Sequence, residues 1–213
     1  MEFPDRSISA YAETFTSAES DLLKRINRET WSQVLMPRML SGHLQGRILS
    51  MISKMLQPQR ILEIGTYTGY SALCLAEGLQ AGGELHTIDI NDELEERVKA
   101  YFSASAYSAQ LHLHIGAALE VIDRLEGPWD MVFIDADKEN YANYFDAVID
   151  QVRAGGWIIA DNVLWSGKVL EELELMDTET AALHAYNAKV AADARVESLL
   201  LPVRDGLMCC RKR

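Results

Sequence analysis

The sequence predicts an α/β fold: a Rossmann-like, seven-stranded, mostly parallel sheet with an antiparallel last strand, helices on both faces and a helical N-terminal extension. Three observations support this prediction. Short apolar runs alternate with helical patterns, the first run ends at a glycine-containing turn, and the C-terminal segment has the pattern of a hairpin. At 213 residues the chain suits one domain. We expect a single domain over 1–213, with a helical extension over 1–56 and a Rossmann-like core over 57–213.

The N-terminal extension has the periodicity of helices. Apolar residues recur at helical spacing over 5–56, and Pro37 interrupts the pattern. The pattern resumes in "GHLQGRILSMISKML", whose apolar side carries Leu44, Ile48, Ile52 and Met55.

The core alternates strand and helix patterns, which is typical of a parallel sheet covered by helices. Helices are expected to begin near Gly69, Asp92, Ala117, Tyr141 and Asp177. The last segments, "VESLLLPV" and "LMCCRK", flank a turn at "RDG", so the final strand should run antiparallel to its partner. The terminal "RKR" is expected to be a frayed tail. The first five strands are expected at "RILEI", "ELHTIDI", "LHLHI", "DMVFIDA" and "GWIIADN".

Composition restricts the classes of partner. The formal net charge of -12 makes a nucleic acid or an anionic membrane a poor partner. No apolar run reaches the roughly 20 residues of a membrane helix, and no secretory signal is visible. The three cysteines make an unlikely disulfide framework. We therefore expect a cytoplasmic protein.

The glycine turn after the first strand indicates a ligand site. Ligands of open α/β sheets bind beyond the carboxyl ends of the strands, where Gly65 and Gly69 lie. Tyr67 stands where a dinucleotide-binding motif has its middle glycine, and no Walker-type Gly-Lys-Ser/Thr follows. Asp89 ends the second strand, where an acid can accept hydrogen bonds from ribose hydroxyls. The combination favours a nucleoside ligand without a pyrophosphate, such as S-adenosylmethionine (SAM), over a simple tight turn.

Three oxygen-bearing side chains end two neighbouring strands. Asp135 closes the fourth strand, and Asp161 and Asn162 close the fifth. Carboxylate and amide oxygens suit a hard divalent cation such as Mg²⁺, with Mn²⁺ or Ca²⁺ as alternatives. An aspartate at a strand end can instead cap the following helix. Beside a cation the ammonium form of Lys138 is disfavoured, which makes this residue a candidate general base.

Two histidines alternate on the expected third strand. His112 and His114 could face the same side, but no Cys, Asp or third His lies at ligand spacing. We expect both to be strand residues on a polar face, and we do not expect zinc.

These motifs resemble those of the cation-dependent class I O-methyltransferases, the group that includes caffeoyl-CoA and catechol O-methyltransferases. The resemblance runs from about Met36 to the C-terminus. Where plant members have a polar stretch, this chain has "SGHLQGR". The similar segments are "LEIGTYTGYSAL", "IDIN", "FIDADKENYANYF", "GGWIIADNVLWSGKV" and "LPVRDGL".

The resemblance implies methyl transfer from SAM to a hydroxyl of a catechol-type phenolic acceptor, assisted by a divalent cation, in a homodimeric enzyme. A non-catalytic SAM-binding protein and an NAD-dependent dehydrogenase are the alternatives. Lys138 and Asp135 would be catalytic, and Asp135, Asp161 and Asn162 would bind the metal. The cofactor-binding residues implied are Leu40, Ser41, Glu63, Gly65, Tyr67, Ser71, Asp89, Gly116, Ala117 and Asp135.

Overall fold

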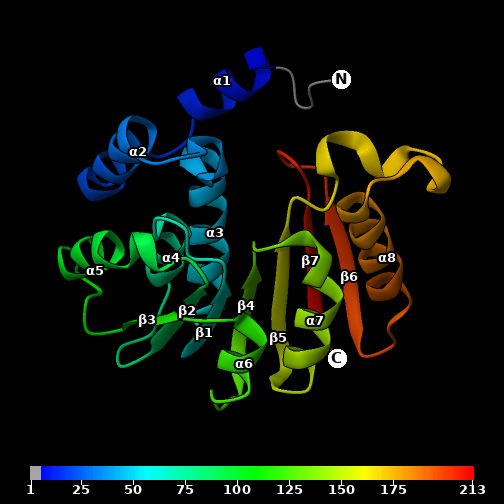
Figure 1. The fold of residues 1–213 in the computed structure, drawn as a ribbon. Helices are drawn as coiled ribbons and strands as arrows, with labels where there is room; N and C mark the ends of the chain where they lie inside the picture. The colour runs from blue at the N-terminus through cyan, green and yellow to red at the C-terminus, as the bar shows by residue number, and fades with distance from the viewer. Residues whose placement is uncertain (1–5) are drawn as a thin grey trace.

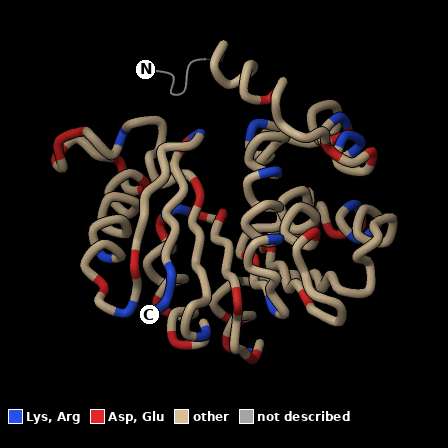
Figure 2. Tube along the Cα trace, turned by 180° about the vertical axis from the view of Figure 1, so that it is seen from behind, with Lys and Arg blue, Asp and Glu red and all other residues tan. Residues whose placement is uncertain are grey.

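A computed structural model describes residues 6–213 as helices packed on both faces of one central sheet (Figure 1). Residues 1–5 belong to the predicted extension over 1–56 and lie outside the described residues. Within the described part, no helix combines the length and the apolar character needed to cross a membrane. Acidic and basic positions are mixed over the molecule (Figure 2).

The sheet has seven strands in the order β3-β2-β1-β4-β5-β7-β6. Pairs β1–β2, β2–β3, β1–β4 and β4–β5 are parallel, whereas β7 runs antiparallel to both β5 and β6. The predicted mostly parallel sheet with an antiparallel last strand is thereby confirmed. The strands are β1 (Arg60–Ile64), β2 (Glu84–Asp89), β3 (Leu111–Ile115), β4 (Trp129–Ile134), β5 (Val152–Asp161), β6 (Val196–Leu201) and β7 (Leu207–Lys212).

Helices bury apolar side chains against both faces of the sheet, as the sequence predicts. One core lies between the sheet and α2, α3, α4 and α5, and the other lies between the sheet and α6, α7 and α8. The α-helices are α1 (Arg6–Thr14), α2 (Asp21–Gln33), α3 (Gly42–Leu56), α4 (Tyr70–Ala76), α5 (Glu95–Ser103), α6 (Ala118–Ile122), α7 (Tyr141–Ile149) and α8 (Thr178–Ala192). Short 3₁₀ helices are η1 (Pro37–Met39), η2 (Asp92–Leu94), η3 (Lys138–Asn140), η4 (Trp165–Leu170) and η5 (Leu173–Leu175).

The strand register brings the carboxyl ends of four parallel strands to one edge of the sheet. Ile64 of β1 pairs with Ile88 of β2 and with Ile134 of β4, and Ile134 pairs with Ala160 of β5. Residues that directly follow these positions are therefore neighbours in space although they are far apart in the sequence. This edge, called here the strand-end edge, holds the candidate site.

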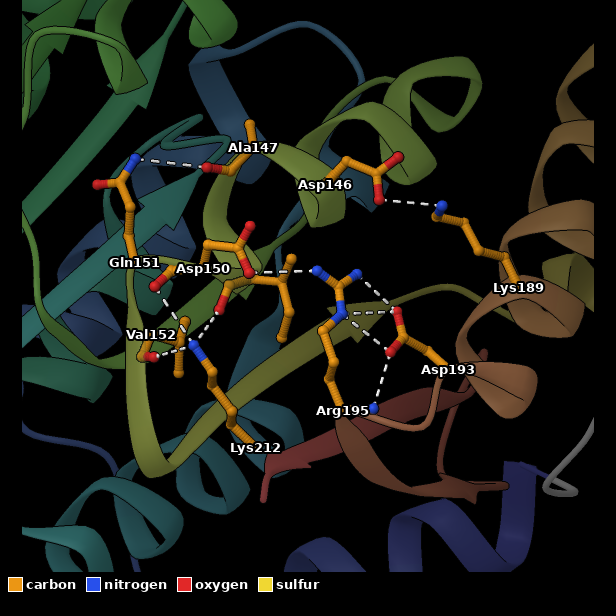
Figure 3. A network of polar contacts seen from close by, with 10 residues as sticks. Asp146, Ala147, Asp150, Gln151, Val152, Lys189, Asp193, Arg195 and Lys212 are labelled. Carbon is orange, nitrogen blue, oxygen red and sulfur yellow. Dashed lines mark hydrogen bonds and ion pairs between the residues drawn. The ribbon is translucent and has the colours of Figure 1, made fainter.

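The C-terminus is held at the opposite end of the sheet (Figure 3). Lys212 Nζ donates to the carbonyl oxygens of Ile149 and Val152, each at 2.7 Å, where α7 passes into β5. Arg195 forms ion pairs with Asp193 and Asp150 beside it. The frayed tail expected for "RKR" is wrong for Lys212, because its ammonium group is held by the carbonyl groups of Ile149, which ends α7, and of Val152, which begins β5.

Candidate active site

Both glycines of the turn after β1 are required by close contacts. Gly65 has φ +102°, and a Cβ there would lie 2.0 Å from the carbonyl oxygen of Asp135. Gly69 has φ +76°, and a Cβ there would lie 2.7 Å from the Phe102 ring. The turn can thus carry the chain from β1 into α4 while β1 and β4 remain adjacent. Close approach within the protein itself is enough to require these glycines.

The Asp89 carboxylate holds this turn in place. Its Oδ2 accepts hydrogen bonds from the backbone N–H groups of Thr66 (3.1 Å) and Tyr67 (2.6 Å), and its Oδ1 accepts one from Asn91 (2.9 Å). Gly116 follows β3 and donates its N–H to the Asp89 carbonyl oxygen at 2.9 Å, which brings Gly116 and the adjoining Ala117 to the same edge. Asp89 therefore has a structural role in the turn, beside any role toward a ligand.

Glu63 lies fully buried beneath the turn. Its Oε2 accepts a hydrogen bond from Thr87 Oγ1 at 2.5 Å, whereas its Oε1 is buried without a hydrogen-bond partner. Burial chiefly raises the pKa of Glu63 to about 8, and the nearby hydroxyls of Ser71 and Thr87 partly offset that rise. Buried polar atoms in proteins nearly always have partners. The free oxygen is therefore suited to a donor or a cationic group of a ligand.

The segment before α3 lies over the glycine turn. Tyr67 Oη donates to the carbonyl oxygens of Leu35 (3.0 Å) and Met36 (3.3 Å). Leu40 and Ser41, which follow in the chain, are buried at the start of α3. The structure thus ties the N-terminal segment that carries Leu40 and Ser41 to the glycine turn.

Lys138 connects two of the predicted metal ligands. Its Nζ donates to Asp135 Oδ1 at 3.1 Å, to Asn162 Oδ1 at 2.9 Å and to Tyr141 Oη at 2.7 Å, and the residue is 7% exposed. The ends of β4 and β5 thus converge on a single positive charge. An oxygen cluster that surrounds an ammonium group is suited to a metal cation as well.

Asp161 lies beside this cluster and is 3% exposed. Its Oδ1 accepts a hydrogen bond from the Asn162 N–H at 2.8 Å, and its Oδ2 accepts one from Gln45 Nε2 at 2.5 Å. Burial, together with the charge of Asp135, raises the pKa of Asp161 to about 7. A cation bound here would favour the charged carboxylate and oppose this rise.

Three residues around the predicted ligands had no assigned role in the site predicted from the sequence. Gln45 holds Asp161, and Arg204 Nη1 donates to Gln45 Oε1 at 2.8 Å. Tyr141 is fully buried, and its Oη donates to the Asp161 carbonyl oxygen at 3.0 Å. Arg204 lies within the motif "LPVRDGL" and Tyr141 within "DADKENY". Both motifs carry the family resemblance, so they could have indicated that these two residues belong to the site.

Trp165 borders the lysine. Lys138 Nζ lies 5.7 Å from the centre of the Trp165 ring, and the indole Nε1 is buried without a hydrogen-bond partner. The backbone of Trp165 is left-handed, with φ +47°. The indole N–H of Trp165, buried beside Lys138 Nζ, is therefore available to donate a hydrogen bond to a polar group of a bound molecule.

Comparison with known proteins identifies several that resemble this chain. A family model described as O-methyltransferase matches residues 12–213. Caffeoyl-CoA O-methyltransferase 5 of Nicotiana tabacum is 35% identical over 179 residues, which cover 79% of this chain and 75% of that protein. The caffeoyl-CoA O-methyltransferase of Stellaria longipes is 33% identical over 204 residues, 91% of this chain and 84% of that protein.

Solved structures have the same fold. A Podospora anserina methyltransferase with bound SAH superposes with a TM-score of 0.90 at 29% identity, covering 100% of this chain and 98% of that chain. The O-methyltransferase TomG of Streptomyces achromogenes, in complex with SAM, gives a TM-score of 0.88 at 26% identity, covering 97% and 96% of the two chains.

Proposed function

Because this chain belongs to the O-methyltransferase family, we propose that it transfers a methyl group from SAM to one hydroxyl of a catechol-type small molecule with the help of a divalent cation. Family membership favours an enzyme over a non-catalytic SAM-binding protein, and it argues against an NAD-dependent dehydrogenase. The homodimer expected from the sequence is part of this proposal.

SAM is assigned to the strand-end edge between β1 and β2. The free Oε1 of Glu63 supports this assignment, because it offers a buried acceptor to the ammonium group of the methionine part. Asp89 would bind the ribose from the same edge. The Podospora anserina and Streptomyces achromogenes structures, which hold SAH and SAM, support a ligand of this class. The residues proposed around it are Leu40, Ser41, Glu63, Gly65, Tyr67, Ser71, Asp89, Gly116, Ala117 and Asp135.

A divalent cation is assigned to Asp135, Asp161 and Asn162. The observation that carries this assignment is the ammonium group of Lys138, which contacts Asp135 and Asn162 at the edge where Asp161 is buried. These residues offer oxygen atoms alone, which favours Mg²⁺, with Mn²⁺ or Ca²⁺ as alternatives.

The chemistry follows from these residues. When bound, SAM supplies a methyl group on a sulfonium, and a divalent cation supplies a charge that lowers the pKa of a neighbouring hydroxyl. Lys138 Nζ, freed from Asp135 and Asn162 and in the neutral amine form that a nearby divalent cation would favour, would accept the proton of the attacking hydroxyl. Asp135 orients Lys138, and Trp165 would border the acceptor ring beside it.

Methylation assays test the proposal. The protein is incubated with SAM, Mg²⁺ and matched pairs of catechols and phenols with a single hydroxyl, and the products are identified by mass spectrometry. Catechols should be methylated and single-hydroxyl phenols should be poor acceptors. Both EDTA and Asp161→Ala should abolish turnover while SAM binding, measured by calorimetry, stays largely intact. Restored Mg²⁺ should reverse the effect of EDTA.

Asp146→Ala changes an aspartate of α7 that pairs with Lys189 and serves as the matched control, which should keep full activity. Turnover that survives EDTA would overturn the role of the cation, even in a protein that proves to be a methyltransferase.

A further inference from the structure

Three histidines lie together on β2 and β3. His86 of β2 pairs in register with His112 of β3, and His114 lies two residues further along β3. Because side chains alternate along a strand, all three imidazoles are on the same face of the sheet. The His86 ring centre lies 4.8 Å from that of His112 and 5.2 Å from that of His114.

A carboxylate joins this cluster. Glu84 Oε2 lies 3.4 Å from His86 Nε2. One potential ligand atom from each of Glu84, His86 and His112 lies within 4.8 Å of the other two. His112 Nε2 is buried without a hydrogen-bond partner. A ring nitrogen is thus left free, within a group of three residues of metal-binding types.

The remaining histidine orients His86. His86 Nδ1 lies 3.0 Å from His114 Nε2, which leaves His86 Nε2 directed toward Glu84. Histidines that bind metals usually donate their second ring N–H to a nearby acceptor. Burial chiefly lowers the pKa of His86 to about 4 and also lowers the pKa of His114. Neutral imidazole is the form that binds metals.

We propose that Glu84, His86 and His112 bind a zinc ion, with His114 holding the His86 ring in position. Two imidazoles and one carboxylate form a ligand set that Zn²⁺ accepts, and a water molecule can complete four-coordination. The sequence alone does not predict zinc, because no third ligand lies near His112 and His114 along the chain. The structure supplies the missing ligands from the neighbouring strand.

The site differs in position and chemistry from the strand-end edge. Glu84 is the first residue of β2, whereas Asp89 at the strand-end edge is the last. Zinc here would tie the edge strand β3 to β2, so its role is to stabilise this side of the sheet.

Zinc binding by the whole chain tests the inference. The protein is freed of metal with EDTA, the chelator is removed, and Zn²⁺ is titrated by calorimetry with Mg²⁺ in excess. Elemental analysis gives the stoichiometry. We expect one zinc ion per chain. His112→Gln should weaken binding by more than about 100-fold through loss of a ligand, and His114→Gln by roughly 10–100-fold through loss of the orienting contact.

Two controls separate this site from others. His184→Gln changes an exposed histidine of α8 and should bind zinc as the unmodified protein does. Asp161→Ala should also keep zinc binding, whereas zinc held at the strand-end edge would be lost. Zinc should raise the Tm of the unmodified protein by roughly 5–10 °C at about 100 times Kd.

NMR of the unmodified protein tests the site even if a variant fails to fold. The imidazole ¹⁵N signals of His86 and His112 should shift on addition of zinc, and those of His184 should not. The inference is overturned if the protein binds no zinc, if His112→Gln binds it equally well, if Asp161→Ala abolishes binding, or if the signals of His86 and His112 stay unchanged.

Discussion

The side-chain amide of Gln45 donates to Asp161 Oδ2 at 2.5 Å, joining α3 to the end of β5 across 116 positions of the chain. Gln45 is itself oriented by Arg204, which donates to its Oε1. The N-terminal extension therefore does more than cover the site: it holds one oxygen of a proposed metal ligand in place.

Gln45→Leu tests this arrangement. The hydrogen bond from Gln45 lowers the pKa of Asp161, so its loss should move that pKa above about 7. A proton would then compete with the cation for Asp161 at neutral pH. We expect the Mg²⁺ affinity, measured by calorimetry, to fall roughly tenfold or more at pH 7 and to recover largely by pH 9. Gln33→Leu, in an exposed glutamine of α2, is the control. Equal Mg²⁺ affinity in the unmodified protein and in Gln45→Leu at pH 7 would contradict the arrangement.

The stability of the metal-free protein should depend on Asp161 through pH. Its pKa rises from an ordinary 3.8 to about 7 on folding, so the folded state binds the proton more tightly than the unfolded state does. This contribution to stability is complete below pH 4 and is lost as the pH rises through 7. Asp161→Asn should therefore raise the Tm at pH 8 more than at pH 5, measured by calorimetry in EDTA. Asp146→Asn should show no such difference, and an equal effect of Asp161→Asn at both pH values would refute the prediction.

Asp89→Ala should impair both the ligand site and the turn. Loss of the proposed pair of charge-assisted hydrogen bonds to ribose should weaken SAM binding by about 1.5–3 kcal/mol. Loss of the bonds from Thr66 and Tyr67 should also lower the Tm in the absence of SAM. Calorimetric titration and thermal denaturation measure the two effects separately. Asp92→Ala, in an exposed aspartate nearby, is the control; a lowered Tm with unchanged SAM affinity would show that Asp89 acts on the turn alone.

Assembly as a homodimer is expected from exposed apolar side chains of α1 and of Phe15, which directly follows this helix. Ile8, Tyr11 and Phe15 are 61%, 68% and 74% exposed. Burying such a surface against a second copy would remove it from water. Light scattering should give the dimer mass, and Tyr11→Glu combined with Phe15→Glu should shift it toward the monomer. A monomer mass over a broad concentration range would refute this prediction.

The fold followed from local patterns in the sequence. Apolar runs placed the strands, and the predicted helix starts at Tyr141 and Asp177 agree with the observed beginning of α7 and the N-cap of α8. The prediction of a frayed tail was wrong for Lys212, because its Nζ contacts carbonyl groups about 60 residues earlier in the chain. Such a contact depends on the completed sheet.

The site was predictable only in part, for a related reason. The strand pattern predicts that aspartates at the carboxyl ends of parallel strands lie together, since these ends meet at one edge of the sheet. Gln45 reaches Asp161 from α3, whose expected apolar side of Leu44, Ile48, Ile52 and Met55 did not include it. That expectation was wrong: Met55 is exposed, and the buried side of α3 consists of Gln45, Gly46, Leu49, Ser50 and Ser53, because the helix packs small and polar side chains against the site. His86 and His112 are neighbours only once the register of β2 and β3 is known.

Lys138→Met separates a general base from a residue that merely holds others in place. Loss of a positioned base should lower kcat by roughly 10²–10⁴-fold, with SAM affinity unchanged. Part of that loss should return at high pH, where the acceptor hydroxyl ionises without help. Lys138 also contacts Asp135 and Asn162, so a structural role would instead change the Mg²⁺ requirement. Steady-state rates are therefore measured against pH and against Mg²⁺ concentration, with Lys168→Met, in an exposed lysine paired with Asp177, as the control. A kcat that returns to normal at saturating Mg²⁺ and neutral pH would assign Lys138 to positioning and leave the base to be found elsewhere.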